Sequence, residues 1–278
     1  MTALLVPALA GCSDFALRSL DATAERAGIV IHKSVSFDAP HQLDLDVYAP
    51  VAAVNAPVVV FFHGGRWQTG NRTQYAFVGR ALAAHGIVAI LPDYRKFPAA
   101  RQPEFLSDAA RAVAWSRQHA RDYGGDPARL FLMGHSSGAH MVAMLATDAR
   151  WFAAEHLAPR DIAGVIGVAG PYDFLPLTEA DLVDLFGNDP AEQQQSQPVN
   201  FIDGDEPPFL LLHGNADTTV WPRNSESLAR ALRLRGVRAD LKRYDHIGHS
   251  GILVALSRLL RGKAATLADT LEFIRSLH

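Results

Sequence analysis

From about residue 29 onward, short apolar runs rich in β-branched residues alternate with longer stretches whose apolar positions recur every three or four residues. The short runs predict buried strands and the longer stretches predict amphipathic helices. We expect strands over residues 29–37, 43–48, 57–62, 87–91, 129–133, 162–168, 209–212 and 239–244. This alternation is typical of a mostly parallel sheet with helices on both faces, so the chain is predicted to be an α/β protein with about eight strands.

The helical stretches lie between these runs and end at recognisable stop signals. We expect helices over residues 75–85, 103–123, 137–147 and 224–235, and a helical C-terminus from residue 251 onward. Gly86 and the sequence GGDP after Tyr123 favour helix termination. The first two strands follow each other closely, which predicts an antiparallel pair before the parallel part of the sheet begins.

Residues 170–208 interrupt this alternation, because they are rich in Pro, Asp and Gln and contain the sequence EQQQSQP. One short helical patch is expected at 182–186. The segment is too polar for the core, so we interpret it as a small lid inserted over the C-terminal edge of the sheet.

Composition excludes one class of partner and bounds the number of domains. A chain of 278 residues, 49% of them hydrophobic, is long enough for one sizeable core, and we expect a single domain over residues 13–278. The formal net charge is −3, with 26 basic and 29 acidic residues spread along the chain. Because no basic stripe is present, nucleic acid is not an expected partner.

The first twelve residues form a candidate lipoprotein signal segment. Cys12, the single cysteine of the chain, ends the sequence LAGC, which resembles the lipobox at which bacterial lipoprotein signal peptides are cut before acylation. Only Met1 and Thr2 precede the apolar run, without the Lys or Arg of a signal peptide, so a buried or frayed N-terminal segment is the alternative. If the lipobox is used, the protein is anchored at the bacterial cell envelope through a lipid on Cys12; otherwise it is cytoplasmic.

The sequence GHSSG at residues 134–138 matches GxSxG and lies between a predicted strand and a predicted helix. A strand-to-helix turn this tight needs glycines beside the serine, and it leaves Ser136 projecting as a nucleophile. The alternative is a serine that caps the helix. The triplet GHS recurs at 248–250 in GHSG, and there we expect the histidine, and not the serine, to take part in catalysis.

A serine nucleophile requires a base and an acid that orients the base. In α/β enzymes with this turn the acid and then the histidine follow the serine along the chain. Asp217 and His249 come after the last two predicted strands in that order. Asp173, Asp245 and His246 are the rival candidates, and Asp217 could instead cap the following helix.

The sequence HGGRW at 63–67 follows a predicted strand and offers backbone amides for an oxyanion hole. Gly65, Arg66 and Ser137 are the expected donors. Trp67 is a candidate for substrate binding, with simple packing as the equal alternative. Neither a cysteine cluster nor HExxH is present, so we expect no metal.

Together these motifs resemble the α/β-hydrolase superfamily, and the likeness runs from about residue 29 to the C-terminus. HGGRW, GHSSG, DYR at 93–95, YGGDPARLFLMGHSSGAH and GVAGPYDF are similar to motifs of the carboxylesterase, BD-FAE and kynurenine-formamidase-like groups. Arg66 replaces the last glycine of the HGGG found in the hormone-sensitive-lipase branch. The resemblance implies an α/β-hydrolase fold and ester hydrolysis through an acyl-enzyme, with no metal and no organic cofactor.

We therefore expect a serine carboxylesterase that acts on small-molecule esters with short to medium acyl chains. In this scheme Ser136 attacks, His249 transfers the proton and Asp217 orients His249. An arylformamidase that cleaves N-formylkynurenine is the second hypothesis. A catalytically inactive hydrolase fold that only binds a ligand is the third.

Overall fold

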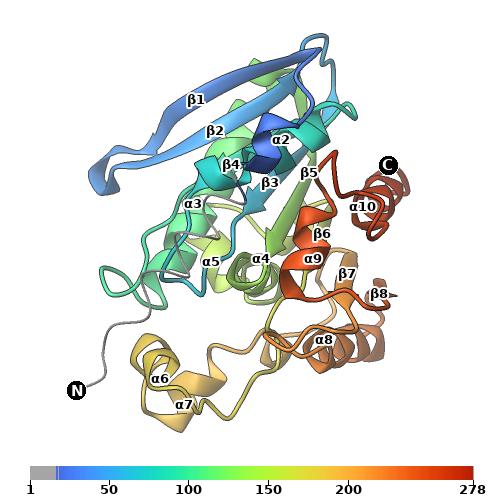
Figure 1. Cartoon of the computed structure of the whole chain (residues 1–278). Helices are drawn as coiled ribbons and strands as arrows, with labels where there is room; N and C mark the ends of the chain where they lie inside the picture. Colours follow the sequence, from blue (N-terminus) through green and yellow to red (C-terminus); the bar gives the residue numbers. More distant parts are fainter. Residues whose placement is uncertain (1–16, 18, 278) are drawn as a thin grey trace, which may run out of the picture.

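The computed structural model of the protein describes residue 17 and residues 19–277, and an eight-stranded sheet forms its centre (Figure 1). The strand order is β1-β2-β4-β3-β5-β6-β7-β8. The strands are β1 (Ile29–Asp38), β2 (Leu43–Pro50), β3 (Ala56–Phe62), β4 (Val88–Pro92), β5 (Gly125–His135), β6 (Gly164–Val168), β7 (Phe209–Gly214) and β8 (Ala239–Tyr244). β2 pairs antiparallel with β1 and with β4, whereas all other pairs are parallel. The predicted fold class is thereby confirmed.

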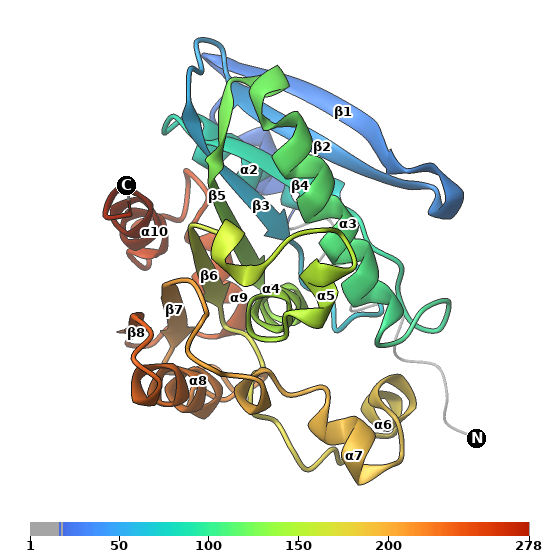
Figure 2. The ribbon, with the colours of Figure 1, turned by 180° about the vertical axis from the view of Figure 1, so that it is seen from behind.

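Helices cover both faces of the sheet, as the two opposite views in Figures 1 and 2 show. They are α2 (Ala76–Ala83), α3 (Glu104–His119), α4 (Ser137–Thr147), α5 (Arg150–Ala153), α6 (Ala180–Phe186), α7 (Pro190–Gln194), α8 (Arg223–Leu234), α9 (His249–Val254) and α10 (Thr266–Arg275). Short 3-10 helices span Ala39–His41, Arg72–Tyr75, Ala120–Tyr123, Pro159–Asp161 and Pro198–Asn200. α2, α9 and α10 lie in front of the sheet in Figure 1, whereas α3, α4, α5 and α8 lie behind it.

The alternation of side chains along β5 explains why the core has two parts. Leu130 and Leu132 point into the cluster beneath α3, α4 and α8, whereas Phe131 and Met133 point into the cluster beneath α2, α9 and α10. Successive residues of a strand face opposite sides, so a strand covered by helices on both sides must be apolar throughout. All four side chains are fully buried.

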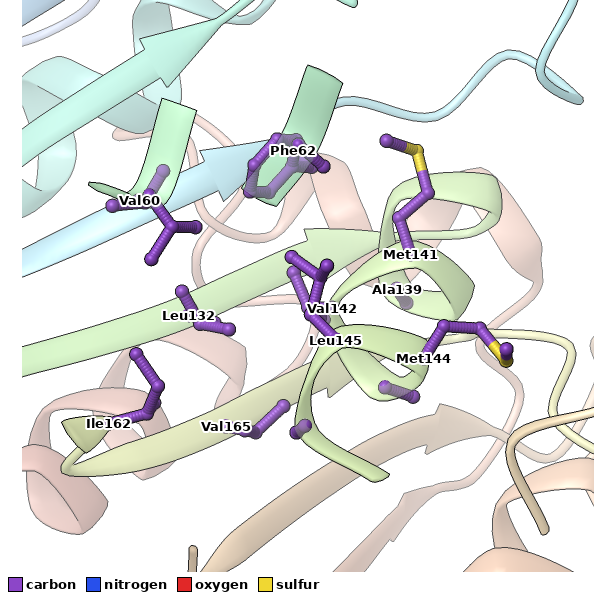
Figure 3. Packing of buried hydrophobic residues seen from close by; sticks show 14 of the residues in the cluster. Val60, Phe62, Leu132, Ala139, Met141, Val142, Met144, Leu145, Ile162 and Val165 are labelled. Carbon is purple, nitrogen blue, oxygen red and sulfur yellow. The ribbon is translucent and has the colours of Figure 1, made fainter. Parts of the chain in front are cut away.

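Helix α4 is held in place by the apolar layer that it forms with β3, β5 and β6 (Figure 3). All eleven of its residues are buried. Val142 and Leu145 pack toward Leu132 of β5, and each such aliphatic side chain contributes about 1.5–3 kcal/mol when it is removed from water. Because α4 starts immediately after Ser136, this packing also holds the serine in position.

The segment 170–208 lies beyond the C-terminal ends of the strands, where α6 and α7 form a separate lobe (Figure 1). The structure corrects the expectation that this segment is too polar for the core. Leu185 and Phe186 of α6 are buried and belong to the same cluster as α3 and α4. The Gln residues that make this segment look polar lie mainly in and around α7, and α7 itself has no buried residue. The composition of the segment therefore hides the apolar residues of α6 that reach the core.

Candidate functional site

Ser136 stands between β5 and α4 with a backbone conformation that few residues other than glycine adopt, at φ 55° and ψ −120°. Such a conformation costs about 1–3 kcal/mol and persists only where the surroundings enforce it. A Cβ atom at Gly134 would lie 2.3 Å from the backbone carbon of Gly138, and one at Gly138 would lie 2.1 Å from the backbone oxygen of Phe62. Both glycines of the motif are therefore required by close backbone packing.

The structure brings Ser136, His249 and Asp217 together, although they are far apart in the sequence. The distance from His249 Nε2 to Ser136 Oγ is 2.9 Å, and that from His249 Nδ1 to Asp217 Oδ2 is 2.7 Å. With Nδ1–H donating to the carboxylate, Nε2 is left free to accept the serine proton. His249 is the first residue of α9, whereas the sequence suggested a loop before the helix.

Asp217 is held by both of its oxygens. Oδ1 accepts hydrogen bonds from the backbone N–H groups of Thr219 and Val220, each at 2.9 Å, and Oδ2 faces His249. Burial alone would raise the pKa of Asp217, but hydrogen bonds from His213, His249 and Val220 outweigh burial and bring the pKa well below its ordinary value. The carboxyl group is thus charged at neutral pH and opposes loss of the Nδ1 proton from His249.

His213 is a site residue that the sequence reasoning missed. Its Nε2 lies 3.3 Å from Asp217 Oδ2 and 2.9 Å from the carbonyl oxygen of Val220, and its Nδ1 lies 2.7 Å from Ser225 Oγ. The ring is completely buried, so it fixes the loop that carries the acid. The available signal was the sequence HGNAD, in which His213 lies four residues before Asp217.

The other histidines near the serine are poorly suited to act as the base. Burial, assisted by the neighbouring His249, lowers the pKa of His135 to about 3, and burial lowers the pKa of His140 to about 4. His135 Nε2 lies 3.2 Å from the backbone oxygen of His249 and supports the start of α9. His63 is buried between the rings of Tyr75 and Tyr94, and burial also lowers its pKa.

The rival candidates of the sequence lie elsewhere. Asp173 accepts a hydrogen bond from Ser227, and Asp245 accepts one from Asn215. His246 is exposed in the turn before α9. None of these three contacts Ser136 or His249 within the described part of the chain.

A cavity of about 280 Å³ opens onto Ser136 and is lined by Arg66, Trp67 and Ser137 among others. The backbone amides of Arg66 and Ser137 make no hydrogen bond to any described residue. Ser137 is the first residue of α4, where no carbonyl lies one turn earlier to accept its N–H. Both amides are thus available to a substrate oxygen.

Gly65 and Trp67 have different positions around this cavity. The carbonyl of Gly65 closes a turn by accepting from the N–H groups of Gln68 and Thr69, and Gly65 does not line the cavity. Trp67 lines it with only 4% of its surface exposed and packs edge-on against His140 and Phe186. Trp67 therefore packs against the lid and also forms part of the cavity wall.

Arg66 joins this loop to the lid. Its Nε donates to Asp181 Oδ2 at 2.7 Å, its guanidinium also pairs with Glu179, and Gln68 Nε2 donates to Asp181 Oδ2 at 2.8 Å. Hydrogen bonding from Arg66 holds the pKa of Asp181 well below its ordinary value. The charge on Arg66 is therefore neutralised by the lid.

One group of possible metal ligands occurs among the described residues, made of Asp38, His41 and Asp108 on the outer part of the fold. Arg111 pairs with both carboxylates, and Arg95 also binds Asp108 in a fork at 2.7–3.1 Å. These carboxylates are already neutralised by arginines. Their arrangement resembles an ion-pair network rather than a cation site.

Comparison with protein families places both glycine motifs, Ser136 and Asp217 inside one known domain, whereas His249 lies beyond the matched range. The family model of BD-FAE matches residues 45–232. The chain is 31% identical over 216 residues to the esterase LipC of Mycobacterium tuberculosis, an alignment that covers 70% of this chain and 53% of LipC. It is 27% identical over 267 residues to the isoprenylcysteine alpha-carbonyl methylesterase ICME of Arabidopsis thaliana, covering 86% of this chain and 60% of that protein. The chain spans 52–62% of the length of the first curated relatives that it matches.

Solved structures of esterases have the same architecture. Esterase 2 of Thermogutta terrifontis, in a structure with butyrate bound, is 25% identical with a TM-score of 0.72, covering 90% of this chain and 94% of that chain. The same esterase phosphoramylated by tabun gives a TM-score of 0.74 at 26% identity, covering 91% and 96%. An esterase of Pyrobaculum calidifontis shares the fold with a TM-score of 0.79 at 20% identity, covering 98% of this chain and 93% of that one.

Proposed function

The chain belongs to the BD-FAE family of α/β-hydrolases, and from this premise we propose that it is a serine carboxylesterase with Ser136, His249 and Asp217 as its catalytic triad. The observation that carries the proposal is the pair of hydrogen bonds on the two sides of one imidazole, at 2.9 Å to the serine and 2.7 Å to the carboxylate. That arrangement converts an unreactive alcohol into a nucleophile.

The proposed reaction has two stages. In the first, Ser136 Oγ attacks the ester carbonyl while His249 Nε2 takes the hydroxyl proton, and the negative charge that develops on the carbonyl oxygen is stabilised by backbone N–H groups. Collapse of this intermediate breaks the bond to the alcohol, which leaves with the proton from His249 and yields an acyl-enzyme. In the second stage a water molecule repeats the attack and releases the acid.

Arg66 and Ser137 are the amides best placed to stabilise the oxyanion, because both line the cavity at Ser136 and neither amide has another partner among the described residues. Gly65 is proposed as a third donor from its place in the HGGRW loop. Loss of one such donor costs about 3–4 kcal/mol of activation free energy in comparable enzymes.

The volume of the cavity limits the substrate. About 280 Å³ lies near the lower end of the range of about 300–1000 Å³ that is common for small-molecule sites. We therefore expect short and medium acyl esters to be preferred over long ones.

A series of p-nitrophenyl esters from acetate to dodecanoate, hydrolysed by the intact protein, tests this function. We expect kcat/KM to peak among the short and medium acyl chains, because the cavity is small. We also expect the peak value to exceed that for N-formylkynurenine. A larger kcat/KM for N-formylkynurenine than for every ester would indicate an arylformamidase instead. Absence of turnover on all of these compounds would indicate a fold that only binds its ligand.

We also propose that a lipid on Cys12 anchors the protein to the bacterial cell envelope. The support is the LAGC sequence, and Cys12 lies outside the described residues. None of the described helices is long and apolar enough to cross a membrane. In a bacterial host we expect mass spectrometry to find a mature N-terminus at an acylated Cys12, and membrane association to be lost in Cys12→Ser. A mature protein that retains Met1 would contradict the anchor.

A further inference from the structure

The cavity at Ser136 is lined by one charged side chain that pairs with none of the described residues. Three ionisable side chains apart from the triad line it, namely Arg66, Glu179 and Arg223. Arg66 and Glu179 pair with each other, and Asp181 binds Arg66 as well. Arg223 is exposed, and its guanidinium forms no hydrogen bond or ion pair with any residue that the structure describes.

The backbone that carries Arg223 is held firmly beside the cavity. The neighbouring Asn224 is buried, and its side-chain oxygen accepts from the backbone N–H groups of Tyr172 and Asp173, both at 2.9 Å. The side-chain nitrogen of Asn224 donates to the carbonyl of Trp221 at 3.1 Å. The start of α8 is thereby clamped to the start of the lid, and Arg223 lies at their junction.

The surroundings of Arg223 are suited to an amphiphilic ligand. Phe174, Leu177, Leu182 and Trp221 supply apolar wall on the same cavity, and 61% of the surface of Trp221 is exposed. An indole this exposed, on the wall of the cavity that also contains Ser136, can pack against the apolar part of a substrate.

Neither of the carboxylates that lie near Arg223 pairs with it. It also lines an adjoining hollow together with Asp173 and Glu226. Asp173 is bound by Ser227, and Glu226 is paired with Arg243. A free guanidinium with five donors binds a carboxylate in a fork, and this contact is stronger than a neutral hydrogen bond.

We propose that the natural substrates are esters that carry a carboxylate away from the scissile bond, and that Arg223 binds this carboxylate. The inference rests on the proposed function, because it requires that the ester is attacked by Ser136. The net charge of the whole chain is −3, so the general field does not favour an anion. Selectivity for an anionic ester must therefore come from a local contact.

Two matched pairs of substrates test the proposal and locate the charge. On the acyl side, mono-p-nitrophenyl adipate is compared with the p-nitrophenyl ester whose distal carboxylate is replaced by a carboxamide. On the alcohol side, 4-acetoxybenzoate is compared with 4-acetoxybenzamide. For each pair the ratio of kcat/KM for the charged ester to that for the neutral one is measured in the wild type, Arg223→Gln, Arg223→Lys and Arg230→Gln.

We expect Arg223→Gln to lower this ratio about tenfold for at least one pair, because the charge-assisted hydrogen bonds are lost. Arg223→Lys keeps the charge and should recover part of the ratio. Arg230 is the matched control, since it lies two turns further along α8 and has no partner among the described residues. It borders the adjoining hollow but does not line the cavity at Ser136. Arg230→Gln should stay within twofold of the wild-type ratio. In the wild type the ratio should also decrease as the NaCl concentration rises from 0.05 to 0.5 M, because the electrostatic screening length shortens about threefold.

Equal ratios in the wild type and Arg223→Gln for both pairs would overturn the proposal. So would an equal decrease in Arg230→Gln, because the effect would then come from the general field of α8. A poorly folded variant would lose activity on the charged and the neutral ester alike, so the ratio would not change. Partial recovery of the ratio in Arg223→Lys would show that the charge of the side chain, and not its packing, causes the effect. Failure of the wild type to hydrolyse even the neutral esters would instead contradict the esterase assignment.

Discussion

Replacement of Ser136 by Ala is expected to lower kcat for ester hydrolysis by about 10⁴–10⁶-fold and to abolish covalent labelling by a fluorophosphonate. The physical reason is the loss of the atom that forms the acyl-enzyme, since Ser136 Oγ is the group that lies 2.9 Å from His249 Nε2. The strained backbone at φ 55° is imposed by the packing of β5 and α4 and does not depend on the hydroxyl. We therefore expect the variant to fold, with a melting temperature close to that of the wild type.

Ser250 provides the matched control because it follows the second GH pair of the chain. It is exposed in α9, directly after the catalytic base. Ser250→Ala should retain full labelling and near wild-type kcat. Labelling by the fluorophosphonate that persists in Ser136→Ala would refute the proposed nucleophile.

Replacement of Asp217 by Asn should lower kcat by about 10⁴-fold while leaving KM within a few fold. The carboxylate accepts a hydrogen bond from Nδ1–H of His249, with Nδ1 and Oδ2 2.7 Å apart, and an amide in its place allows the proton to move to Nε2. Nε2 could then no longer accept the proton of Ser136. Asp245→Asn is the matched control, because that exposed carboxylate lies in the next loop and contacts Asn215 instead. Equal losses in the two variants would contradict the assignment of the acid.

The same carboxylate makes stability depend on pH. The pKa of Asp217 is lower in the folded protein than in the unfolded chain, where an aspartate has a pKa of about 3.9. Its contribution to the free energy of unfolding is therefore complete well above pH 3.9 and is lost as the pH falls through the folded pKa. Urea unfolding at pH 7 and at pH 3 should show a smaller difference between wild type and Asp217→Asn at the lower pH. A difference that grows with acidity would contradict the direction of this shift.

Much of the fold could be predicted because the signals are local. The strand that leads into Ser136, the helix over 137–147 and the strand over 209–212 are defined by continuous apolar runs and by glycines. A strand covered on both sides can hardly contain polar residues, so its presence is visible in the sequence. The GxSxG turn is equally local. Its two glycines are required because the backbone packs closely within a few residues of the serine and against the end of the adjacent β3.

The lid was predicted less well because its contacts are not local. Leu185 and Phe186 belong to the core only because α6 packs against residues of α3 and α4. Arg66 is bound to Asp181, which lies 115 positions away in the sequence. Periodicity over a short window contains no information about such a partner.

The sequence by itself determined the fold class, the nucleophile turn and a short set of candidates for the acid and the base. Only the tertiary structure decided among Asp173, Asp217 and Asp245, because only it measures which carboxylate lies within hydrogen-bonding distance of His249. It also showed that Arg66 is paired with Asp181, whereas Arg223 has no ion-pair partner in the part of the chain that the structure describes. The physical reason is the same in both cases: residue type and order specify which chemistry is available, whereas the distances between groups remote in the sequence depend on how strands and helices pack.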